Sequence, residues 1–516
     1  MENQSNWTCD ANDAVQISIV QPGQNKLDIL STFQPEFTYP IFGEEETIFG
    51  YKGLNIQLRF SAHDLRSNVN ISYNEKFKTV ADVAPVDLLN TLDPWLPNAS
   101  FAPLPEFENS VVKDESAKSF RPPGKLVHSY TSKQRNYEIW AGSLTDPEVR
   151  TILDRIQIFV SFFIEGGTPI ETDDFEWTLQ RWTVYFIYEK RDPPTSTASP
   201  YSFVGYATTY RWYFYLQDTE SKDTKPQISD SSFPYPEEIS ITKQPARLRI
   251  SQFLILEPHQ KCGHGSHLYQ TIQSACLADP TLHELTIEDP NEAFDYLRDI
   301  NDFHLLQPEL IKQNIIINPD PYTQQQQKSR RPPLMPTSTL IPTETLQNLR
   351  THYKIAPVQF AHLVEMHLLS QIPESHRGTA NTNIARLLVQ KWRAPNEHDR
   401  RYYWWRMLVK QRLYKHHRDL LVQLEKGERV EKLEETLGNV EEGYDSLLKA
   451  LEIRSAKEKQ DAENGDMGVD VKGNAGKERG KRKFTIMEDE DEDEDGEGEN
   501  GAADGGEGGS AKKMKT

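Results

Sequence analysis

A cysteine, three histidines and two glycines lie close together in the sequence LILEPHQKCGHGSHL, residues 254–268. Side chains of these types could bind a metal ion or provide a thiol nucleophile, and such a glycine-containing turn could also hold a phosphate group. The metal hypothesis is weak, because no established zinc pattern has the spacing of these candidates and no second ligand pair lies nearby in the sequence. The candidates are His259, Cys262, His264 and His267. A nucleophilic Cys262 would need a base and an orienting group, and nothing in the sequence designates either.

The phosphate hypothesis has a clearer structural context. An apolar segment, FLILE, runs into residues 260–265, which open a predicted helix. Backbone N–H groups at a helix start lack partners, and the helix dipole favours an anion there. Gly263 and Gly265 would let the backbone approach a pyrophosphate without a Cβ in the way. The spacing fits neither a P-loop nor a GxGxxG motif, and an ordinary glycine-containing turn is the alternative.

The segments around this loop predict an α/β arrangement, because strands and helices alternate there. Apolar and β-branched runs predict strands, and helical periodicity predicts the helices between them. The run at 201–216 could form one long strand or two. The expected strands are 182–190, 201–216, 247–257 and 282–289, and the expected helices are 146–167, 265–278 and 291–303. The first helix has Val149, Ile152, Leu153 and Ile156 on one face and ends at paired glycines.

Composition changes along the chain predict five parts. The first is a β-rich α+β domain in which residues 55–62 and 69–77 alternate like half-buried strands. The helical part has Phe360, Val364, Leu368 and Leu369 on one stripe, followed by one or two long amphipathic helices. The predicted parts are 1–130, an N-terminal α+β domain; 131–317, an α/β domain; 318–343, a Gln/Pro-rich linker; 344–455, a helical domain; and 456–516, a disordered acidic tail.

Bulk composition restricts the class of partner. The 516-residue chain has a net charge of −20, much of it in residues 487–501. This balance argues against nonspecific DNA binding and is compatible with a basic protein partner. Three cysteines without a CxxC pair predict reduced, intracellular thiols. The N-terminus lacks the apolar core of a signal peptide and the longest apolar run, residues 156–164, is too short to span a bilayer, so we expect a soluble protein.

Residues 260–265, QKCGHG, match the Q/R-x-x-G-x-G/A motif of the GNAT acetyltransferase superfamily. Within it, residues 247–272 and 285–299 resemble the catalytic subunits of type B histone acetyltransferases, as does PIFGEEETIFGYKGLNIQL at 40–58. The match covers roughly residues 15–320 and extends, less closely, to about 455. It implies an α+β or α/β chain with a GNAT fold around a mixed central sheet, preceded by the β-rich domain and followed by the helical region. The Gln/Pro linker and the disordered acidic tail, which composition predicts, lie outside the match.

The resemblance implies acetyl-CoA as co-substrate and no metal. Acetyl-CoA would lie along the strand that bears Phe253, Leu254 and Ile255, with the N–H of Leu254 best suited to stabilise the oxyanion. The loop would hold the pyrophosphate and the last helix would flank the coenzyme, although Phe294 could equally be a core residue. The remaining residues of this set are Gln260, Lys261, Cys262, Gly263, His264, Gly265, Ser266, Asn291, Phe294 and Arg298.

The attacking lysine is an ammonium at neutral pH, with an ordinary pKa near about 10.4, and therefore needs a base. By resemblance the base is Glu288, with Asp289 as a helper or as the cap of the next helix; a solvated strand-end glutamate is the alternative. A second carboxylate could come from the sequence IETDDFEW, where the spacing departs from the family. Its candidates are Glu171, Asp174 and Glu176.

The resemblance implies a lysine of newly made, free histone H-four as substrate and a WD-repeat histone chaperone as partner, without direct contact to nucleic acid or membrane. It also implies a place in cytoplasm and nucleus, with links to DNA repair and telomeric silencing. Acidic residues could bind the cationic tail and aromatic residues could line its groove, although a solvated turn and strand core are the alternatives. These residues are Glu44, Glu45, Glu46, Tyr210, Arg211 and Trp212. Rival hypotheses are a catalytically silent histone-binding subunit and a GNAT enzyme for another amine, but the intact loop and Glu288 favour the histone acetyltransferase.

Overall fold

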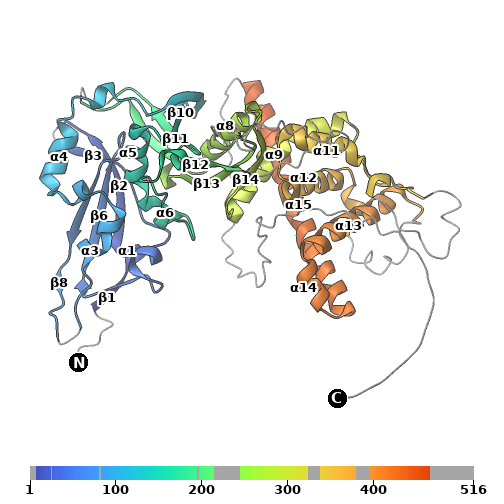
Figure 1. Cartoon of the computed structure of the whole chain (residues 1–516), viewed down its shortest axis with the longest axis horizontal. Coiled ribbons are helices and arrows are strands. Elements are labelled where there is room, and N and C mark those ends of the chain that lie inside the picture. Colours follow the sequence, from blue (N-terminus) through green and yellow to red (C-terminus); the bar gives the residue numbers. More distant parts are fainter. Residues whose placement is uncertain are drawn as a thin grey trace, which may run out of the picture. The chain divides into compact units, whose positions relative to one another are not determined.

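The computed structural model describes residues 7–24, 26–80, 83–193, 197–213, 244–322, 337–378 and 394–464 of the chain. Its elements are two larger β-sheets, two small strand pairs and a set of helices that follow the second large sheet (Figure 1). No helix in these ranges is long and apolar enough to cross a membrane. The acidic run and the rest of the expected tail beyond residue 464 lie outside the described residues.

The N-terminal sheet has four strands in the order β3-β2-β6-β7. Buried and half-buried side chains alternate along its strand β6: Ile56, Leu58 and Phe60 are buried while the residues between them are half-buried. The pairs β1–β4 and β5–β8 and four helices accompany this sheet. The bounds are β1 Thr8–Asp10, α1 Ala11–Ala14, β2 Val15–Pro22, β3 Leu27–Phe33, α2 Tyr39–Phe42, β4 Thr47–Phe49, β5 Tyr51–Lys52, β6 Asn55–Ser61, β7 Ser67–Ser72, β8 Glu75–Lys76, α3 Leu88–Leu92 and α4 Leu104–Val112.

The second sheet has six strands in the order β14-β13-β12-β11-β10-β9. Every neighbouring pair is antiparallel except β13 and β14, which are parallel and joined through helix α8. The sheet is therefore mixed, as expected from the sequence. The bounds are β9 Lys125–Ser132, β10 Arg135–Ser143, β11 Trp182–Lys190, β12 Tyr201–Tyr213, β13 Ala246–Ile255, α8 His264–Ala278, β14 Leu282–Ile287 and α9 Glu292–Lys312. The expected long strand at 201–216 is one strand to Tyr213, beyond which residues 214–243 lie outside the described residues.

The two faces of the six-stranded sheet pack against different elements. One face shares a hydrophobic core with the N-terminal sheet and with α5 Pro147–Ile156 and α6 Ile158–Phe163. The other face packs against α8. Successive side chains of a strand point to opposite faces of the sheet. Phe186 therefore belongs to the first core and its neighbour Ile187 to the second. The helix expected over 146–167 is thus two helices that meet at Gln157, and its predicted apolar face is buried.

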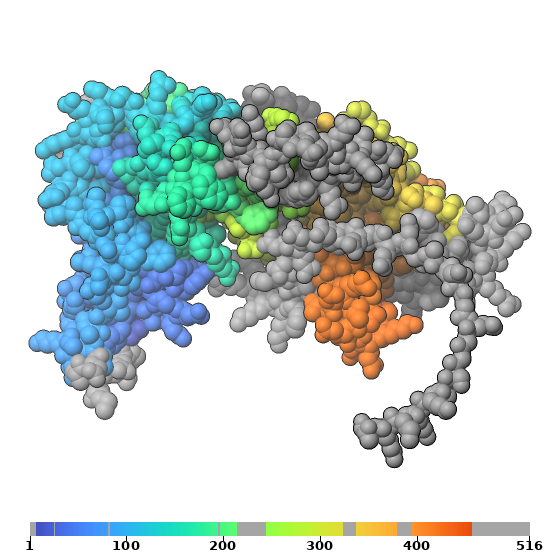
Figure 2. Space-filling model, viewed as in Figure 1, coloured from blue at the N-terminus to red at the C-terminus, as the bar shows by residue number. Residues whose placement is uncertain are grey.

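Helices after residue 337 adjoin the edge strand β14. Ile355 forms a parallel bridge with Leu285 of β14, and the Lys354 ammonium donates to the backbone carbonyls at the end of α8. The stripe predicted on the helix at 357–370 is buried, but the long amphipathic stretch forms three helices rather than one or two. The bounds are α7 Glu176–Leu179, α11 Thr343–Tyr353, α12 Pro357–Ser370, α13 Glu397–His416, α14 Arg418–Gln423 and α15 Lys426–Asn464. In Figure 2 the residues around α14, in orange, lie at the surface. The five domain boundaries stay predictions.

Candidate active site

Strands β13 and β14 pair only along the first half of β13. The parallel register runs from Ala246 to Ile250, and the N–H of Glu288 makes the last bond, to the Ile250 carbonyl at 2.9 Å. Beyond this point β13 continues to Ile255, paired with β12 alone. Among the described residues, no strand therefore covers the outer edge of residues 251–255.

An extra residue on β13 marks the place where the strands separate. Three steps on β13, from Ile250 to Phe253, match two steps on β12. The N–H of Gln252 donates to the Thr208 hydroxyl at 3.0 Å within this bulge. A bulge of this kind reverses the alternation of a strand, so it changes which backbone groups face each neighbour.

The bulge decides which N–H groups face the open edge. The Leu256 N–H donates to the Val204 carbonyl of β12 at 3.0 Å, and Leu254, two residues earlier, faces β12 in the same way. The backbone groups of Phe253 and Ile255 consequently face the open edge. The N–H of Leu254, expected to polarise the thioester, is directed into the ladder instead. The N–H groups that face the open edge are those of Phe253 and Ile255, because the bulge shifts the alternation by one residue.

The loop after β13 ends in an unusual helix start. Lys261 and Gly263 both have left-handed backbone conformations, with φ of 58° and 85°. Gly263 is the N-cap of α8, no side chain caps the helix, and the first bond runs from the His267 N–H to the Gly263 carbonyl at 3.2 Å. The N–H groups of residues 264–266 therefore form a concentrated set of donors, which suits an anion.

Two other loop residues join this helix start to its surroundings. The Gln260 amide donates to the Ile255 carbonyl at 3.0 Å, which ties the loop to the open edge of β13. A Cβ on Gly265 would lie 2.7 Å from Leu297 Cδ1 of α9. Gly265, expected to admit a pyrophosphate, thus also lets α8 pack closely against Leu297 of α9.

The histidines that are prominent in the sequence pack against the hairpin of β9 and β10. His264 is 2% exposed, with Nδ1 2.7 Å from the Tyr130 hydroxyl, and the ring of His267 stacks on Tyr130 at a centroid distance of 3.8 Å. Burial lowers the pKa of His264 to about 3 and that of His267 to about 4, so both are neutral near pH 7. Cys262 lies in the same loop with Sγ 3.5 Å from the Lys133 ammonium. Neither histidine supplies a positive charge for an anion.

Glu288 lies where β14 ends and the open edge of β13 begins. Its side chain is exposed, and the Tyr210 hydroxyl lies 3.3 Å from Glu288 Oε1. Burial, followed by the Glu288 charge, raises the pKa of Tyr210, so the phenol stays protonated at neutral pH and donates to the carboxylate. Trp182 packs beside Tyr210 at 4.6 Å between ring centroids. The arrangement places an oriented carboxylate where β14 leaves β13 and the backbone groups of Phe253 and Ile255 face the open edge.

The candidate residues after Glu288 make two kinds of contact: one caps a helix and others pack in the interior. Asp289 is exposed with φ of 38°, but the cap of α9 is Asn291, whose side chain accepts from the Phe294 N–H at 2.9 Å. The alternative that Asp289 caps this helix was therefore wrong. Phe294 packs edge-on against Phe253 at 4.9 Å, beneath the open edge, and Arg298 is buried at 5% exposure.

The acidic residues proposed for a histone tail differ in their surroundings. Glu44 and Glu45 are exposed. Glu46 instead accepts from the backbone N–H groups of Thr38, at 2.7 Å, and Tyr39, at 3.2 Å. The carboxylate of Glu46 thus holds the start of α2, which leaves Glu44 and Glu45 as the residues directed to solvent.

The other substrate candidates follow Tyr210 on β12. Arg211 forms an ion pair with Asp279 and donates to the Thr281 hydroxyl at 2.9 Å, so it ties β12 to the turn before β14. Trp212 is 44% exposed, with the Arg249 guanidinium 4.9 Å from its ring centre. Arg211 is therefore occupied by a structural contact, whereas Trp212 offers an aromatic surface.

The three candidates for a second carboxylate precede β11. Asp174 accepts from the N–H of Phe175 at 2.6 Å, and Glu171 and Glu176 are exposed. In the described part of the chain, no hydrogen bond or ion pair joins any of them to Glu288.

An open groove of about 650 Å³ lies beside the same loop. Its polar residues include the Glu36 and Glu257 carboxylates, and Phe163 belongs to its apolar wall. Sequence reasoning missed this groove because distant segments form it and no motif joins them. The lining residues are Gln16, Thr32, Phe33, Gln34, Pro35, Glu36, Phe163, Glu257 and Gln260.

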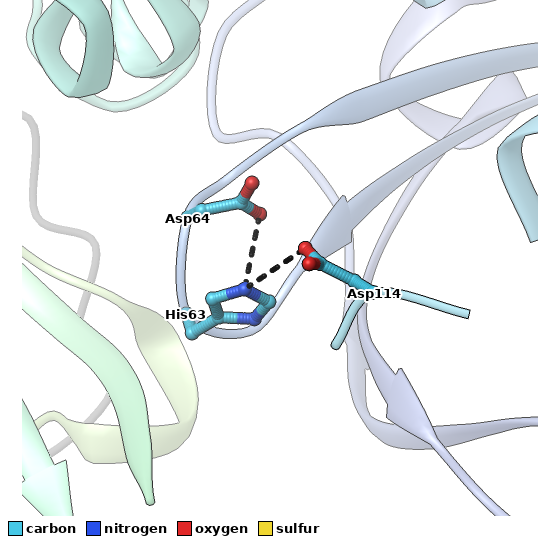
Figure 3. A group of neighbouring side chains, drawn as sticks. All are labelled: His63, Asp64 and Asp114. Carbon is cyan, nitrogen blue, oxygen red and sulfur yellow. Dashed lines mark ion pairs between the residues drawn. The ribbon is translucent and has the colours of Figure 1, made fainter. Parts of the chain in front are cut away.

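One side-chain group in the described ranges has metal-ligand composition: His63, Asp64 and Asp114 (Figure 3). Arg66 forms ion pairs with both carboxylates, and Arg155 lies 3.2 Å from Asp64 Oδ2. Burial lowers the pKa of His63. Two guanidinium groups already neutralise the carboxylates, so the set does not fit a metal ion; it ties α5 to the turn between β6 and β7.

Comparison with known proteins adds independent findings. Residues 7–165 match the family model described as "Histone acetyl transferase HAT1 N-terminus". A protein of Aspergillus oryzae is 58% identical over 499 residues, which cover 95% of this chain and 97% of the relative. Relatives from Emericella nidulans and Neurospora crassa are 56% and 37% identical over 453 and 508 residues, covering 87% and 95% of this chain and 90% and 96% of their own lengths. Each of the three is named histone acetyltransferase type B catalytic subunit.

Proposed function

The chain belongs to the family of histone acetyltransferase type B catalytic subunits, and from this we propose that it transfers the acetyl group of acetyl-CoA to a lysine of newly made, free histone H-four. The deprotonated lysine attacks the thioester directly. The observation that carries the proposal is the position of Glu288 at the point where β13 and β14 separate, beside backbone donors that face the opening.

Glu288 is the proposed general base. The substrate ammonium gives its proton to this carboxylate, because only the free amine can attack. The amine nitrogen then forms a bond to the acetyl carbon and the carbon–sulfur bond breaks, which leaves coenzyme A as the thiol after it takes a proton. Tyr210 supports the role of Glu288 by a hydrogen bond at 3.3 Å that orients the carboxylate.

Acetyl-CoA fits the open edge of β13. The N–H of Phe253 or Ile255 would stabilise the negative charge that develops on the thioester oxygen. Residues 264–266, at the start of α8, would hold the pyrophosphate through their N–H groups. Two features support this placement: an edge of β13 that no strand of the described ranges covers, and the left-handed Gly263 cap.

The charges around the site favour a basic substrate. Glu36 and Glu257 line one groove, Glu44 and Glu45 are exposed, and none of the four has an ion-pair partner among the described residues. Carboxylates so placed attract a cationic tail, and the exposed ring of Trp212 offers an apolar surface for it. These charges support a basic histone tail as substrate. The choice of histone H-four, a WD-repeat chaperone as partner and a place in cytoplasm and nucleus are proposed from the family resemblance alone.

An acetylation assay with labelled acetyl-CoA tests the proposal against its rivals. We expect transfer to free histone H-four, less transfer to nucleosomes and little to small amines. An absence of transfer to free histone, with histone binding retained, would instead support a silent histone-binding subunit. Equal transfer to small amines would support a GNAT enzyme for another amine.

A further inference from the structure

The helix starts near the loop at 260–266 contain few positive charges. The loop side contains Lys133 and Lys261, whereas the first turn of α9 contains the acidic residues Glu292 and Asp295. Burial lowers the pKa values of His264 and His267, so both side chains are neutral near pH 7. Coenzyme A carries a 3′-phosphate in addition to the pyrophosphate, and a phosphate in this region needs a cation beside it.

The long C-terminal helix α15 extends into this region. It packs against α9 and α12, and Leu447, Leu448 and Leu451 contact the core that includes Phe303 of α9. In Figure 1 α15 runs beside α9, against which it packs. Helical periodicity places Arg454 one turn beyond Leu451, on the same side of the helix.

Arg454 follows Leu451, which packs on the core that includes Phe303 of α9, and its charge acts on groups of both α8 and α9. Its charge helps to lower the pKa of His267 on α8, after burial and His128. On α9, burial raises the pKa of Tyr296 and the charge of Arg454 opposes that rise. The two helices touch between these residues, where Gly265 meets Leu297. Arg454 is therefore a partly buried cation beside the seam between α8 and α9.

We propose that Arg454 binds the 3′-phosphate of coenzyme A at this seam, so that the C-terminal helix completes the cofactor site. The inference rests on the proposed function, in which residues 264–266 hold the pyrophosphate and leave the 3′-phosphate to be bound. A guanidinium suits the task because it stays charged and can donate two parallel hydrogen bonds to one phosphate. Its partial burial limits competition from solvent and strengthens the ion pair.

Calorimetric titration of the full chain tests this role with two ligands, acetyl-CoA and acetyl-3′-dephospho-CoA. Arg454→Gln should weaken acetyl-CoA binding about tenfold, the size of one charge-assisted hydrogen bond, and should leave binding of the dephospho ligand within about twofold. Arg454→Lys should recover part of the loss, because it keeps the charge without the planar fork. The matched control is Lys449→Gln, since Lys449 is exposed five residues earlier on the same helix.

The outcomes separate the inference from the function on which it rests. Failure of the unmodified chain to bind acetyl-CoA would contradict the proposed function. Normal acetyl-CoA binding by Arg454→Gln, or an equal loss for both ligands, would overturn the role of Arg454 alone. The salt dependence of Kd gives an additional readout, because Arg454→Gln should reduce its slope for acetyl-CoA, which a purely structural defect would not do.

Discussion

The hydroxyl of Tyr210 on β12 lies 3.3 Å from the carboxylate of Glu288, which follows β14 two strands away. The bond passes across the end of the ladder between β13 and β14, where the Ile250 carbonyl receives the last backbone hydrogen bond from β14. The end of this pairing thus creates both the free edge that we propose for the thioester and the position of Glu288, the proposed base. One local change in strand register accounts for both features.

Replacing Tyr210 by phenylalanine should lower kcat about tenfold and leave the Kd for acetyl-CoA unchanged. The substitution removes one hydrogen bond to a charged carboxylate but keeps the ring that packs against Trp182. Steady-state kinetics and calorimetry measure the two effects. Tyr213→Phe is the matched control on the same strand, because the Tyr213 hydroxyl has no hydrogen-bond partner among the described residues. Equal kcat values for Tyr210→Phe and the unmodified chain would show that Tyr210 does not orient the base.

Acid should destabilise the protein through its buried histidines. The pKa values of His264 and His267 in the folded protein, about 3 and about 4, lie below the ordinary value of 6.5. Between these limits the unfolded chain binds more protons, so the free energy of unfolding falls as pH decreases from about 6.5 towards 4. Each histidine contributes a slope of at most about 1.4 kcal/mol per pH unit.

Urea unfolding at several pH values measures this effect in a His264→Asn variant. Asparagine keeps an acceptor for the Tyr130 hydroxyl but cannot be protonated, so the loss of stability with acid should be shallower. The exposed His304 supplies the control, and His304→Asn should keep the steep dependence. A slope as steep in His264→Asn as in the unmodified chain would be inconsistent with a neutral, buried His264.

Lys354 should stabilise α8 from outside the sheet. Its ammonium donates to the carbonyls of Cys276, Leu277 and Asp279 at 2.8, 3.2 and 2.6 Å, which places a cation at the C-terminal end of the helix dipole. Lys354→Met should lower the free energy of unfolding by about 1–3 kcal/mol, measured with denaturant. Lys312→Met, at a mostly exposed lysine, should change it by less than about 0.5 kcal/mol. Comparable effects of the two variants would remove the capping role.

Gly263 should be required for the geometry of the helix start. Its φ of 85° costs a residue with a side chain about 1–2 kcal/mol, so Gly263→Ala should distort the loop or destabilise it by that amount. We expect a weaker Kd for acetyl-CoA by about tenfold. Gly427→Ala is the control, because a Cβ there meets no atom within 4 Å and its φ is ordinary. Unchanged acetyl-CoA binding by Gly263→Ala would argue against the pyrophosphate loop.

Local patterns in the sequence sufficed for the elements but not for their register. The strand expected at 182–190 has those bounds in the structure, because its apolar run and its flanking residues are local signals. The bulge after Ile250 left no such signal, and it moved the free N–H groups from Leu254 to its neighbours. The role of Glu46 in holding α2 likewise depends on a left-handed turn that its sequence does not reveal.

Contacts between segments far apart in the chain also could not be predicted from the sequence. The groove that joins Glu36 to Glu257 and the position of Arg454 beside α8 arise from packing between residues more than 150 apart in the chain. The structure around the QKCGHG segment, in contrast, was predictable from the sequence, because a strand, a glycine turn and a helix follow one another directly there. Side chains that drew attention by type, such as His264, are packing groups.

The most direct test of Glu288 as the general base is the turnover of free histone H-four by the Glu288→Gln variant. The Kd for acetyl-CoA is determined on the same protein. Loss of a general base predicts a fall in kcat of at least about a hundredfold, while Kd stays within about twofold. Glu292→Gln, at an exposed residue of the next helix, is the matched control. A kcat for Glu288→Gln equal to that of the unmodified chain would contradict the central claim that Glu288 takes the proton from the substrate lysine.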